Sequence, residues 1–294
     1  MPVHTPRFSR SRSGACALLA SGALLLAGGC AGRPEAPILE PAASPAVVQT
    51  ADRLAALLPA DVLLVGEQHD AQAHHAIEQQ IVATLAARGL LAGLALEMAE
   101  SGASTARLKP SASEAQARSA LNWDEQAWPW ADYGPAVMAA VRAGVPVVGA
   151  NLPRAQMPAS MRDARLDARL RGPALQAQQQ AIRLGHCALL PEDQITPMAR
   201  VQIAKDIAMA EALQQLVLPG KTVVLLAGNG HADRRLGVPQ HLPADLKAHA
   251  LRLRAGPAES GPEAEAFDSV WATPALPAAD HCAQLRARFA APAR

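Results

Sequence analysis

The densest group of chemically reactive side chains lies between Glu67 and His75. Within these nine residues stand Glu67, His69, His74 and His75, which are residue types that bind metals or transfer protons. The apolar run Val62–Val65 precedes them and predicts a short strand buried on both faces. Ligands of open α/β sheets bind at the carboxyl ends of strands. We therefore predict a functional site here, the alternative being a junction whose polar residues only cap a helix.

A Gly-x-x-His sequence follows a predicted strand twice, once ending at His69 and once at His231. The second copy comes directly after the apolar run 222–227. A third predicted strand, over residues 93–97, ends in the carboxylate of Glu97. Because parallel strands present their carboxyl ends at one edge of a sheet, we expect both histidines to share a pocket mouth beside Glu67 and Glu97.

Several further residues are candidates for contacting a ligand. Asn151 and Arg154 follow the predicted strand 145–149, and the guanidinium of Arg154 suits a carboxylate or phosphate. His186 interrupts a helical region. Tyr133, the one tyrosine of the chain, follows three of the four tryptophans (Trp123, Trp128 and Trp130). This aromatic cluster fits a small satellite core and a wall for a flat apolar ligand equally well.

Strand and helix patterns alternate along the chain and predict an α/β fold, with a mostly parallel central sheet flanked by helices. Further strands are expected at 250–254 and 267–272. Residues 155–218 have only helical patterns and predict a helical insertion or lid over the carboxyl edge of the sheet. Its last helix, expected over 197–218, carries Gln202 and Asp206 on one face, and we expect these two to face His69 and His231.

Composition excludes several classes of protein. The chain of 294 residues carries 27 basic and 26 acidic side chains without a block of like charge, so we expect no nucleic-acid partner. It contains no G-x-G-x-x-G fingerprint, no phosphate-binding P-loop and no G-x-S-x-G nucleophile elbow. Nucleotide-binding and serine-hydrolase functions are therefore poor interpretations.

The N-terminal segment has the pattern of a targeting sequence. Basic residues precede an apolar stretch over 15–27, which ends in Leu-Ala-Gly-Gly-Cys at Cys30. This resembles a bacterial lipobox, although ordinary secretion with cleavage nearby is the alternative. We predict a lipoprotein signal peptide over 1–29, a lipidated Cys30, a flexible tether over 30–50 and a folded domain over 51–294. The lipid would anchor the chain at the outer or inner membrane, facing the periplasm.

Two cysteines, Cys187 and Cys282, remain once the signal segment and the lipidated Cys30 are set aside. In an oxidising periplasm such a pair forms a disulfide if the geometry allows it. We expect that disulfide, with two buried thiols as the alternative.

Taken together, these motifs resemble the ChaN-like family of haem-binding bacterial lipoproteins. That family belongs to a wider superfamily with Tiki, TraB and the erythromycin esterases. The matching pieces are Leu-Val-Gly-Glu-Gln-His to His69 with His74-His75, Leu-Glu-Met around Glu97, Trp128 to Tyr133, Gly-Ala-Asn-Leu-Pro-Arg to Arg154, His186-Cys187, Gln202 to Met209, Gly-Asn-Gly-His to His231 and Gly-Val-Pro to Pro239. They extend over about residues 50–242, so the resemblance covers nearly the whole predicted domain.

The resemblance implies periplasmic haem binding as part of haem and iron uptake. Histidine and tyrosine are both known haem-iron ligands, so the candidates are Tyr133 and the histidines at 69, 74, 75, 186 and 231. Arg154 or a histidine would meet the propionates. Haem is large, and a second copy of the chain, forming a homodimer, could complete the pocket.

The wider superfamily supports an alternative. In Tiki-like proteins two Gly-x-x-His motifs and an acidic residue bind a divalent metal such as Mn, Co or Zn for hydrolysis. Carried across, the ligands are His69, Glu97 and His231, with Glu67 as general base or a further ligand. In the esterase branch, similarly placed Glu and His activate water without metal. The alternative function is therefore hydrolysis of peptide or ester bonds by the same four residues.

Overall fold

Apolar runs with β-branched and leucine side chains build the centre of the fold. The computed structural model describes residues 45–170, 172–257, 261 and 264–290. In this part of the chain six strands form one sheet. They are β1 (Val62–Glu67), β2 (Leu91–Glu100), β3 (Val147–Asn151), β4 (Thr222–Gly228), β5 (Ala248–Ala255) and β6 (Ser269–Thr273). Every strand predicted from the sequence is present, and the predicted α/β class is confirmed.

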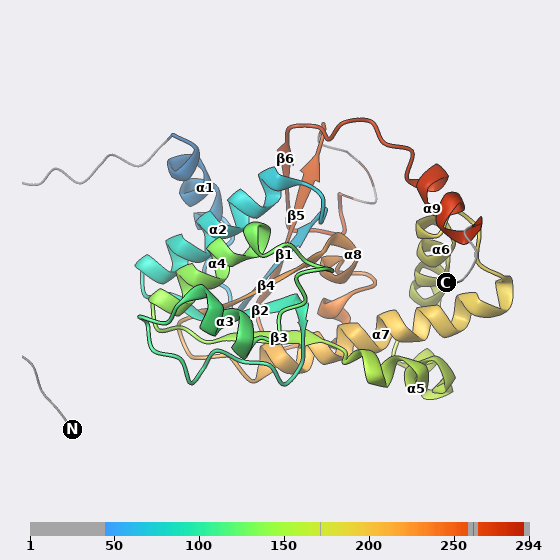
Figure 1. Ribbon diagram of the computed structural model, residues 1–294, viewed down its shortest axis with the longest axis horizontal. Helices are drawn as coiled ribbons and strands as arrows, with labels where there is room; N and C mark the ends of the chain where they lie inside the picture. Colours follow the sequence, from blue (N-terminus) through green and yellow to red (C-terminus); the bar gives the residue numbers. More distant parts are fainter. Residues whose placement is uncertain (1–44, 171, 258–260, 262–263, 291–294) are drawn as a thin grey trace, which may run out of the picture. The chain divides into compact units, whose positions relative to one another are not determined.

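The strand order is β3-β2-β4-β1-β5-β6, and each neighbouring pair is parallel. Strand β4 therefore lies between β2 and β1 (Figure 1). Its register places Gly228 opposite Glu67 of β1 and Leu226 opposite Leu96 of β2. Three segments that are far apart in the sequence consequently end side by side at the carboxyl edge of the sheet.

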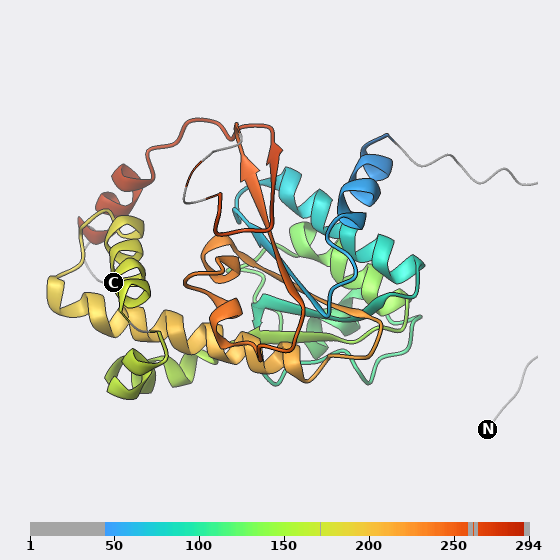
Figure 2. The same cartoon turned by 180° about the vertical axis from the view of Figure 1, so that it is seen from behind.

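The described helices are α1 (Pro45–Ala55), α2 (Gln72–Ala87), α3 (Glu114–Ala120), α4 (Trp130–Arg142), α5 (Met157–Arg162), α6 (Pro173–Gly185), α7 (Glu192–Gln214), α8 (Asn229–Ala232) and α9 (His281–Ala290). Short 3₁₀ turns, η1 (Arg154–Gln156), η2 (Ala164–Ala168) and η3 (Val238–His241), complete the connections. The helices cover the sheet on both faces (Figures 1 and 2).

Alternate residues of β1 pack into two different apolar clusters. Leu63 and Val65 join the cluster that contains residues of α1, α2 and α4. Val62 and Leu64 join the cluster on the other face, which contains Met209 of α7. All of these side chains are buried, so the sequence prediction of a strand buried on both faces is confirmed.

Two helices extend through prolines, and one of them begins earlier than the sequence predicts. Helix α4 contains Pro135, and α7 begins at Glu192 rather than at Pro197. A proline removes one backbone donor and disfavours a helix interior. In α7, Ile195 and Ala199 pack with Ile182 of α6, and this burial on both sides of the proline stabilises the helix through it.

The helical insertion between β3 and β4 is confirmed. Helices α5 and α6 pack against α7, and they lie beyond the strand ends, whereas α7 runs back along the sheet (Figures 1 and 2). A disulfide joins Cys187, after α6, to Cys282 of α9, with 5.6 Å between their Cα atoms.

The predicted signal peptide over 1–29 and Cys30 lie outside the described residues, as does the tether up to residue 44. The last residues of that predicted tether are helical, since α1 begins at Pro45. None of the helices in the described ranges combines the length and the apolar character that a membrane crossing requires.

Candidate functional site

Glu67, the last residue of β1, supports the site from beneath. Its Oε1 accepts a hydrogen bond from the Tyr133 hydroxyl at 2.7 Å and lies 2.7 Å from His69 Nδ1. Burial by itself would raise the pKa of Glu67, but the hydrogen bond with His69 and the charges of His69 and His75 lower it to about 2. Glu67 is therefore a carboxylate anion that fixes the orientation of the His69 ring.

His69 presents the most accessible imidazole of the cluster, with 38% of its side chain exposed. Its ring meets Trp128 edge-on, with 4.9 Å between the ring centroids. Nε2 lies 3.8 Å from Glu97 Oε2. Burial lowers the pKa of His69, but the Glu67 hydrogen bond and the Glu97 charge raise it overall. The two ring nitrogens of His69 thus lie beside different carboxylates, Nδ1 beside Glu67 and Nε2 beside Glu97.

The glycines of the two Gly-x-x-His sequences allow a close approach of chain segments. A Cβ atom on Gly66 would lie 2.7 Å from Oδ1 of Asn229. A Cβ atom on Gly228 would lie 2.9 Å from Nε2 of His69. Any larger residue would push these groups apart, so glycine is what lets the ends of β1 and β4 meet.

Glu97 is the carboxylate that both Gly-x-x-His histidines share. Its Oε1 lies 3.3 Å from His231 Nε2, and its Oε2 accepts a hydrogen bond from the Gly228 amide at 2.8 Å. On the other side of the ring, His231 Nδ1 is 2.5 Å from Asp206 Oδ1. The structure thus brings together His69, Glu97 and His231 as expected, and α7 contributes Asp206 as expected.

The charges of this group depend on one another. Burial lowers the pKa of His231, but Glu97 and Asp206 raise it to about 10. Burial raises the pKa of Asp206 to about 6, although the charge and the hydrogen bond of His231 act to lower it. Burial raises the pKa of Glu97 too, but His231 and His69 bring it far below its usual range. Lys205 adds a further cation 3.9 Å from Glu97 Oε1. At neutral pH, Glu97 therefore lies between cations.

A groove of about 380 Å³ opens beside this group. Its lining includes Glu97, Trp128, Asn151 and Arg154. Asn151 donates a hydrogen bond from its side chain to the Glu97 carbonyl at 2.8 Å, so it positions the strand end. Arg154 is exposed at the groove. Both residues that the sequence predicted to follow β3 therefore lie at the site.

The aromatic cluster combines the two roles that the sequence left open. Trp123 and Trp130 pack together at 5.1 Å between ring centroids and belong to the core cluster or its immediate surroundings. Trp128 instead contacts His69 and lines the groove. Trp128 therefore lines the groove, whereas Trp123 and Trp130 belong to the core or pack against it.

Other sequence candidates lie away from the exposed face. Tyr133 is buried beneath Glu67. Burial, and next the negative charge of Glu67, raise the pKa of the Tyr133 hydroxyl. His74 is fully buried between the Gln68 amide and Thr273, and burial lowers its pKa to about 4. Both side chains are buried and hydrogen-bonded beneath the exposed cluster.

His186 is not part of the cluster. It caps α6, where its Nδ1 lies 2.9 Å from the Ile182 carbonyl. His186 lies in the helical insertion and makes a local contact there, so its predicted role as a site residue stays a prediction.

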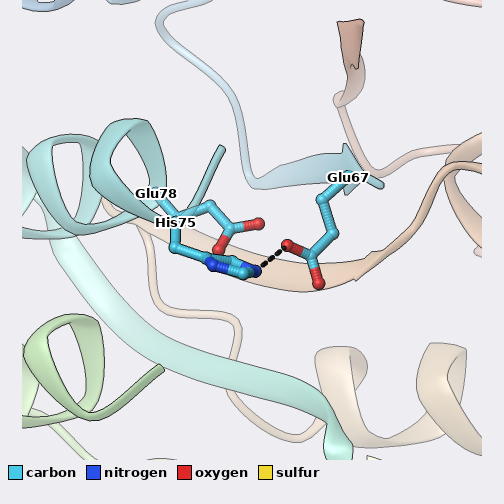
Figure 3. Close-up of side chains that lie close together, drawn as sticks. All are labelled: Glu67, His75 and Glu78. Atoms are coloured by element: carbon cyan, nitrogen blue, oxygen red, sulfur yellow. Dashed lines mark ion pairs between the residues drawn. The ribbon is translucent and has the colours of Figure 1, made fainter. Parts of the chain in front are cut away.

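A second buried layer lies under His69, and sequence reasoning missed part of it. His75 Nε2 is 3.0 Å from Glu67 Oε2, and Glu78 lies beside them (Figure 3). Glu78 shares the buried face of α2 with Ile81, Val82 and Leu85. A carboxylate within an apolar helix face is the signal that could have revealed it.

The family is decided by a match over most of the domain. Residues 53–242 match the family model described as "Haem-binding uptake, Tiki superfamily, ChaN". The chain belongs to the ChaN family. The matched range includes all residues of the exposed cluster and ends before α9, so the ChaN family model accounts for the site and not for the Cys282 half of the disulfide.

A solved structure of a ChaN protein agrees with membership of the ChaN family. The chain is similar to a structure described as "Cofacial heme binding to ChaN of Campylobacter jejuni", with 27% sequence identity and a TM-score of 0.60. The match covers 71% of this chain and 87% of that chain. A structure of the type III effector HopBA1 matches with 18% identity and a TM-score of 0.45, over 77% of this chain and 94% of that one. No curated protein sequence matches the chain.

The shared carboxylate makes a testable prediction about protonation. His231 will remain protonated through neutral pH, with a pKa of about 10, whereas His241, whose pKa burial and the Arg169 charge lower to about 4, will remain neutral. Asp206→Asn will lower the pKa of His231 by about one unit or more, since one opposite charge is lost. Nitrogen chemical shifts of the imidazoles, followed by NMR during a pH titration, measure both.

The same titration has a consequence for stability. A raised pKa in the folded state stabilises the fold fully below the unfolded value near 6.5, and this contribution is lost as the pH rises toward 10. A His231 resonance that titrates near pH 6.5 in the folded chain would contradict the assigned ion pairs.

Proposed function

We propose that this ChaN-family chain binds haem at the carboxyl edge of its sheet, with the iron held by Nε2 of His69. The observation that carries the proposal is the exposed His69 ring, fixed by Glu67 and placed beside a groove. Histidine is a common axial ligand of haem iron. A carboxylate on the other ring nitrogen orients such a ligand and makes it more basic.

The residues around His69 fit the chemistry of a haem. Trp128 offers an aromatic surface against the ring of His69. Arg154 is exposed in the lining of the same groove, where its guanidinium suits a propionate carboxylate. Bound haem supplies iron as a Lewis acid for the imidazole nitrogen. The protein residues then hold the macrocycle and neutralise its acidic edge.

We propose further that a second copy of the chain completes the site. The groove, at about 380 Å³, is at the lower end of the range of about 300–1,000 Å³ that small-molecule sites occupy. The Campylobacter jejuni ChaN structure is described as showing cofacial haem binding. A face-to-face pair of haems, with one protomer on either side, would bury the surface that a single groove leaves open.

Finally, we propose a periplasmic, lipid-anchored role in haem or iron uptake. The support is the lipobox-like sequence at Cys30 and the disulfide between Cys187 and Cys282, which is typical of oxidising compartments. Acylation would hold the haem site at a membrane surface without a membrane-spanning helix.

The first prediction concerns the iron ligand. Titration of the purified chain with haemin will produce a shifted Soret band. His69→Ala will weaken haemin affinity by about tenfold or more, because a metal–ligand bond is lost. Tyr133→Phe will keep the band position, since the hydroxyl is committed to Glu67. Absorption spectroscopy measures both variants.

His186→Ala is the matched histidine control, because His186 lies in the helical insertion, and it should bind haemin like the parent chain. If Tyr133→Phe abolishes the band while His69→Ala leaves it unchanged, the ligand assignment is wrong. If haemin does not bind but the chain hydrolyses p-nitrophenyl esters in a His69-dependent way, the hydrolase alternative is favoured, with Glu67 and His69 activating water.

The second prediction concerns assembly. If two protomers enclose the haems, the sedimenting species will change from monomer to dimer as haemin is added, and Arg154→Ala will shift this transition to higher haemin concentration. Analytical ultracentrifugation at several haemin ratios measures the change. A monomer at saturating haemin would refute the shared site.

The third prediction concerns the anchor. Expressed in a Gram-negative bacterium, the chain will incorporate radiolabelled palmitate and fractionate with membranes, and Cys30→Ser will lose the label. Cys187→Ser serves as the matched cysteine control, because it should keep the label. Release of an unlabelled parent chain into the periplasm would rule out lipidation.

A further inference from the structure

A compact group of three potential metal ligands lies beneath the proposed haem face. It consists of Glu67 at the end of β1 and of His75 and Glu78 on α2 (Figure 3). One ligand atom from each residue lies within 4.8 Å of those of the other two. His75 and Glu78 are three positions apart on the helix, so both side chains project from the same face toward Glu67.

The group has unmet polar atoms where burial is nearly complete. Glu78 is 1% exposed, and neither of its carboxylate oxygens has a hydrogen-bond partner among the described residues. The same is true of Glu67 Oε2 and of both ring nitrogens of His75. The 3.0 Å contact between His75 Nε2 and Glu67 Oε2 is close, but it lacks hydrogen-bond geometry. Buried polar atoms without partners are costly and rare, and a bound ion is one explanation for them.

The charges around Glu67 favour a cation at this position. Oε1 of Glu67 is already engaged by Tyr133 and His69, which leaves Oε2 toward Glu78. Glu78 lies buried beside this oxygen without a hydrogen-bond partner among the described residues, and two facing carboxylates are unfavourable on their own. A divalent ion between them would neutralise both and satisfy their open lone pairs.

We propose that Glu67, His75 and Glu78 bind a divalent first-row transition metal ion, such as Zn²⁺, Mn²⁺ or Fe²⁺. One imidazole and two carboxylates suit these metals, whereas Ca²⁺ and Mg²⁺ prefer oxygen ligands alone. Asp132 Oδ1 lies 3.7 Å from His75 Nδ1, where a carboxylate commonly orients a metal-binding histidine.

This site is distinct from the one that the superfamily resemblance suggests. The three potential ligands of that set are His69, Glu97 and His231, which belong to the exposed cluster. The inner set contains none of these three. It shares with that set only Glu67, which the resemblance gave as a general base or a further ligand. It also does not depend on haem binding, because its atoms lie on the side of Glu67 that faces α2. Glu67 would then link the two layers through its two oxygens.

The test uses the haem-free, chelator-treated chain and Zn²⁺ as the probe. We expect about one Zn²⁺ per chain by calorimetry, and a rise of the melting temperature with Zn²⁺. Glu78→Gln, an isosteric change, will weaken Zn²⁺ binding by about 100-fold or more and will abolish the rise. His231→Gln is the matched control, because it removes a ligand of the outer set and leaves the inner set intact.

The outcomes separate the possibilities. A parent chain that binds no Zn²⁺ would mean that Glu67 and Glu78 share a proton instead, and it would overturn the proposal. Loss of Zn²⁺ binding in His231→Gln but not in Glu78→Gln would place the metal at the outer set and would also overturn it. A haemin titration of Glu78→Gln tests haem binding separately. A failure of the metal proposal can therefore be distinguished from a failure of the proposed function.

A second measurement does not depend on any variant at the inner site. Mn²⁺ added to the parent chain should show, by pulsed electron paramagnetic resonance, coupling to imidazole nitrogen, and His231→Gln should show the same coupling. Absence of nitrogen coupling in the parent chain, or its loss in His231→Gln, would contradict the assignment of His75.

Discussion

The site depends on a single carboxylate, Glu97, held between two imidazoles from different parts of the chain. It contacts His69 through one oxygen and His231 through the other. Burying a carboxylate is costly unless opposite charges and hydrogen bonds compensate it. Here His231 and Lys205 supply the charge, and the Gly228 amide supplies a hydrogen bond. Removing one partner would leave the others with an unbalanced charge, so the group functions as a unit.

The sheet topology makes this contact possible. Strand β4 pairs with both β1 and β2, so the ends that carry His231, His69 and Glu97 are neighbours although about 160 residues separate the histidines. The glycines at 66 and 228 then permit the close approach. Helix α7 approaches from the insertion and completes the group with Asp206. Each residue of this charged group comes from a different element. The fold as a whole, and not one loop, therefore sets the distances between these residues.

Much of this arrangement follows from local sequence patterns. Uninterrupted apolar runs such as Val62–Val65 can only be satisfied by burial on both faces, so the strands and the parallel sheet were predictable. The repeated Gly-x-x-His sequence indicated that His69 and His231 would meet. The depth of a side chain is different, because it depends on packing between distant elements. Tyr133 and His75 were plausible ligands by residue type, yet α2 and α4 bury them beneath Glu67.

Other features were hidden because tertiary packing overrides local preference. The prolines at 135 and 197 predict helix boundaries, but both lie inside helices whose neighbouring residues are buried. The sequence did not single out Glu78, because an amphipathic helix is recognised from its apolar positions. A single carboxylate among those positions does not change the pattern. His186 has the residue type of a ligand, but its contact with the Ile182 carbonyl is purely local.

The disulfide between Cys187 and Cys282, which are 95 positions apart in sequence, covalently closes the segment of chain between them into a loop. Strands β4, β5 and β6 all belong to this segment. A protease that cuts the backbone once anywhere between the two cysteines therefore produces no separate fragment. The piece bearing His231 stays attached to the piece bearing His69 and Glu97, and the two halves of the charged group would remain together after such a nick.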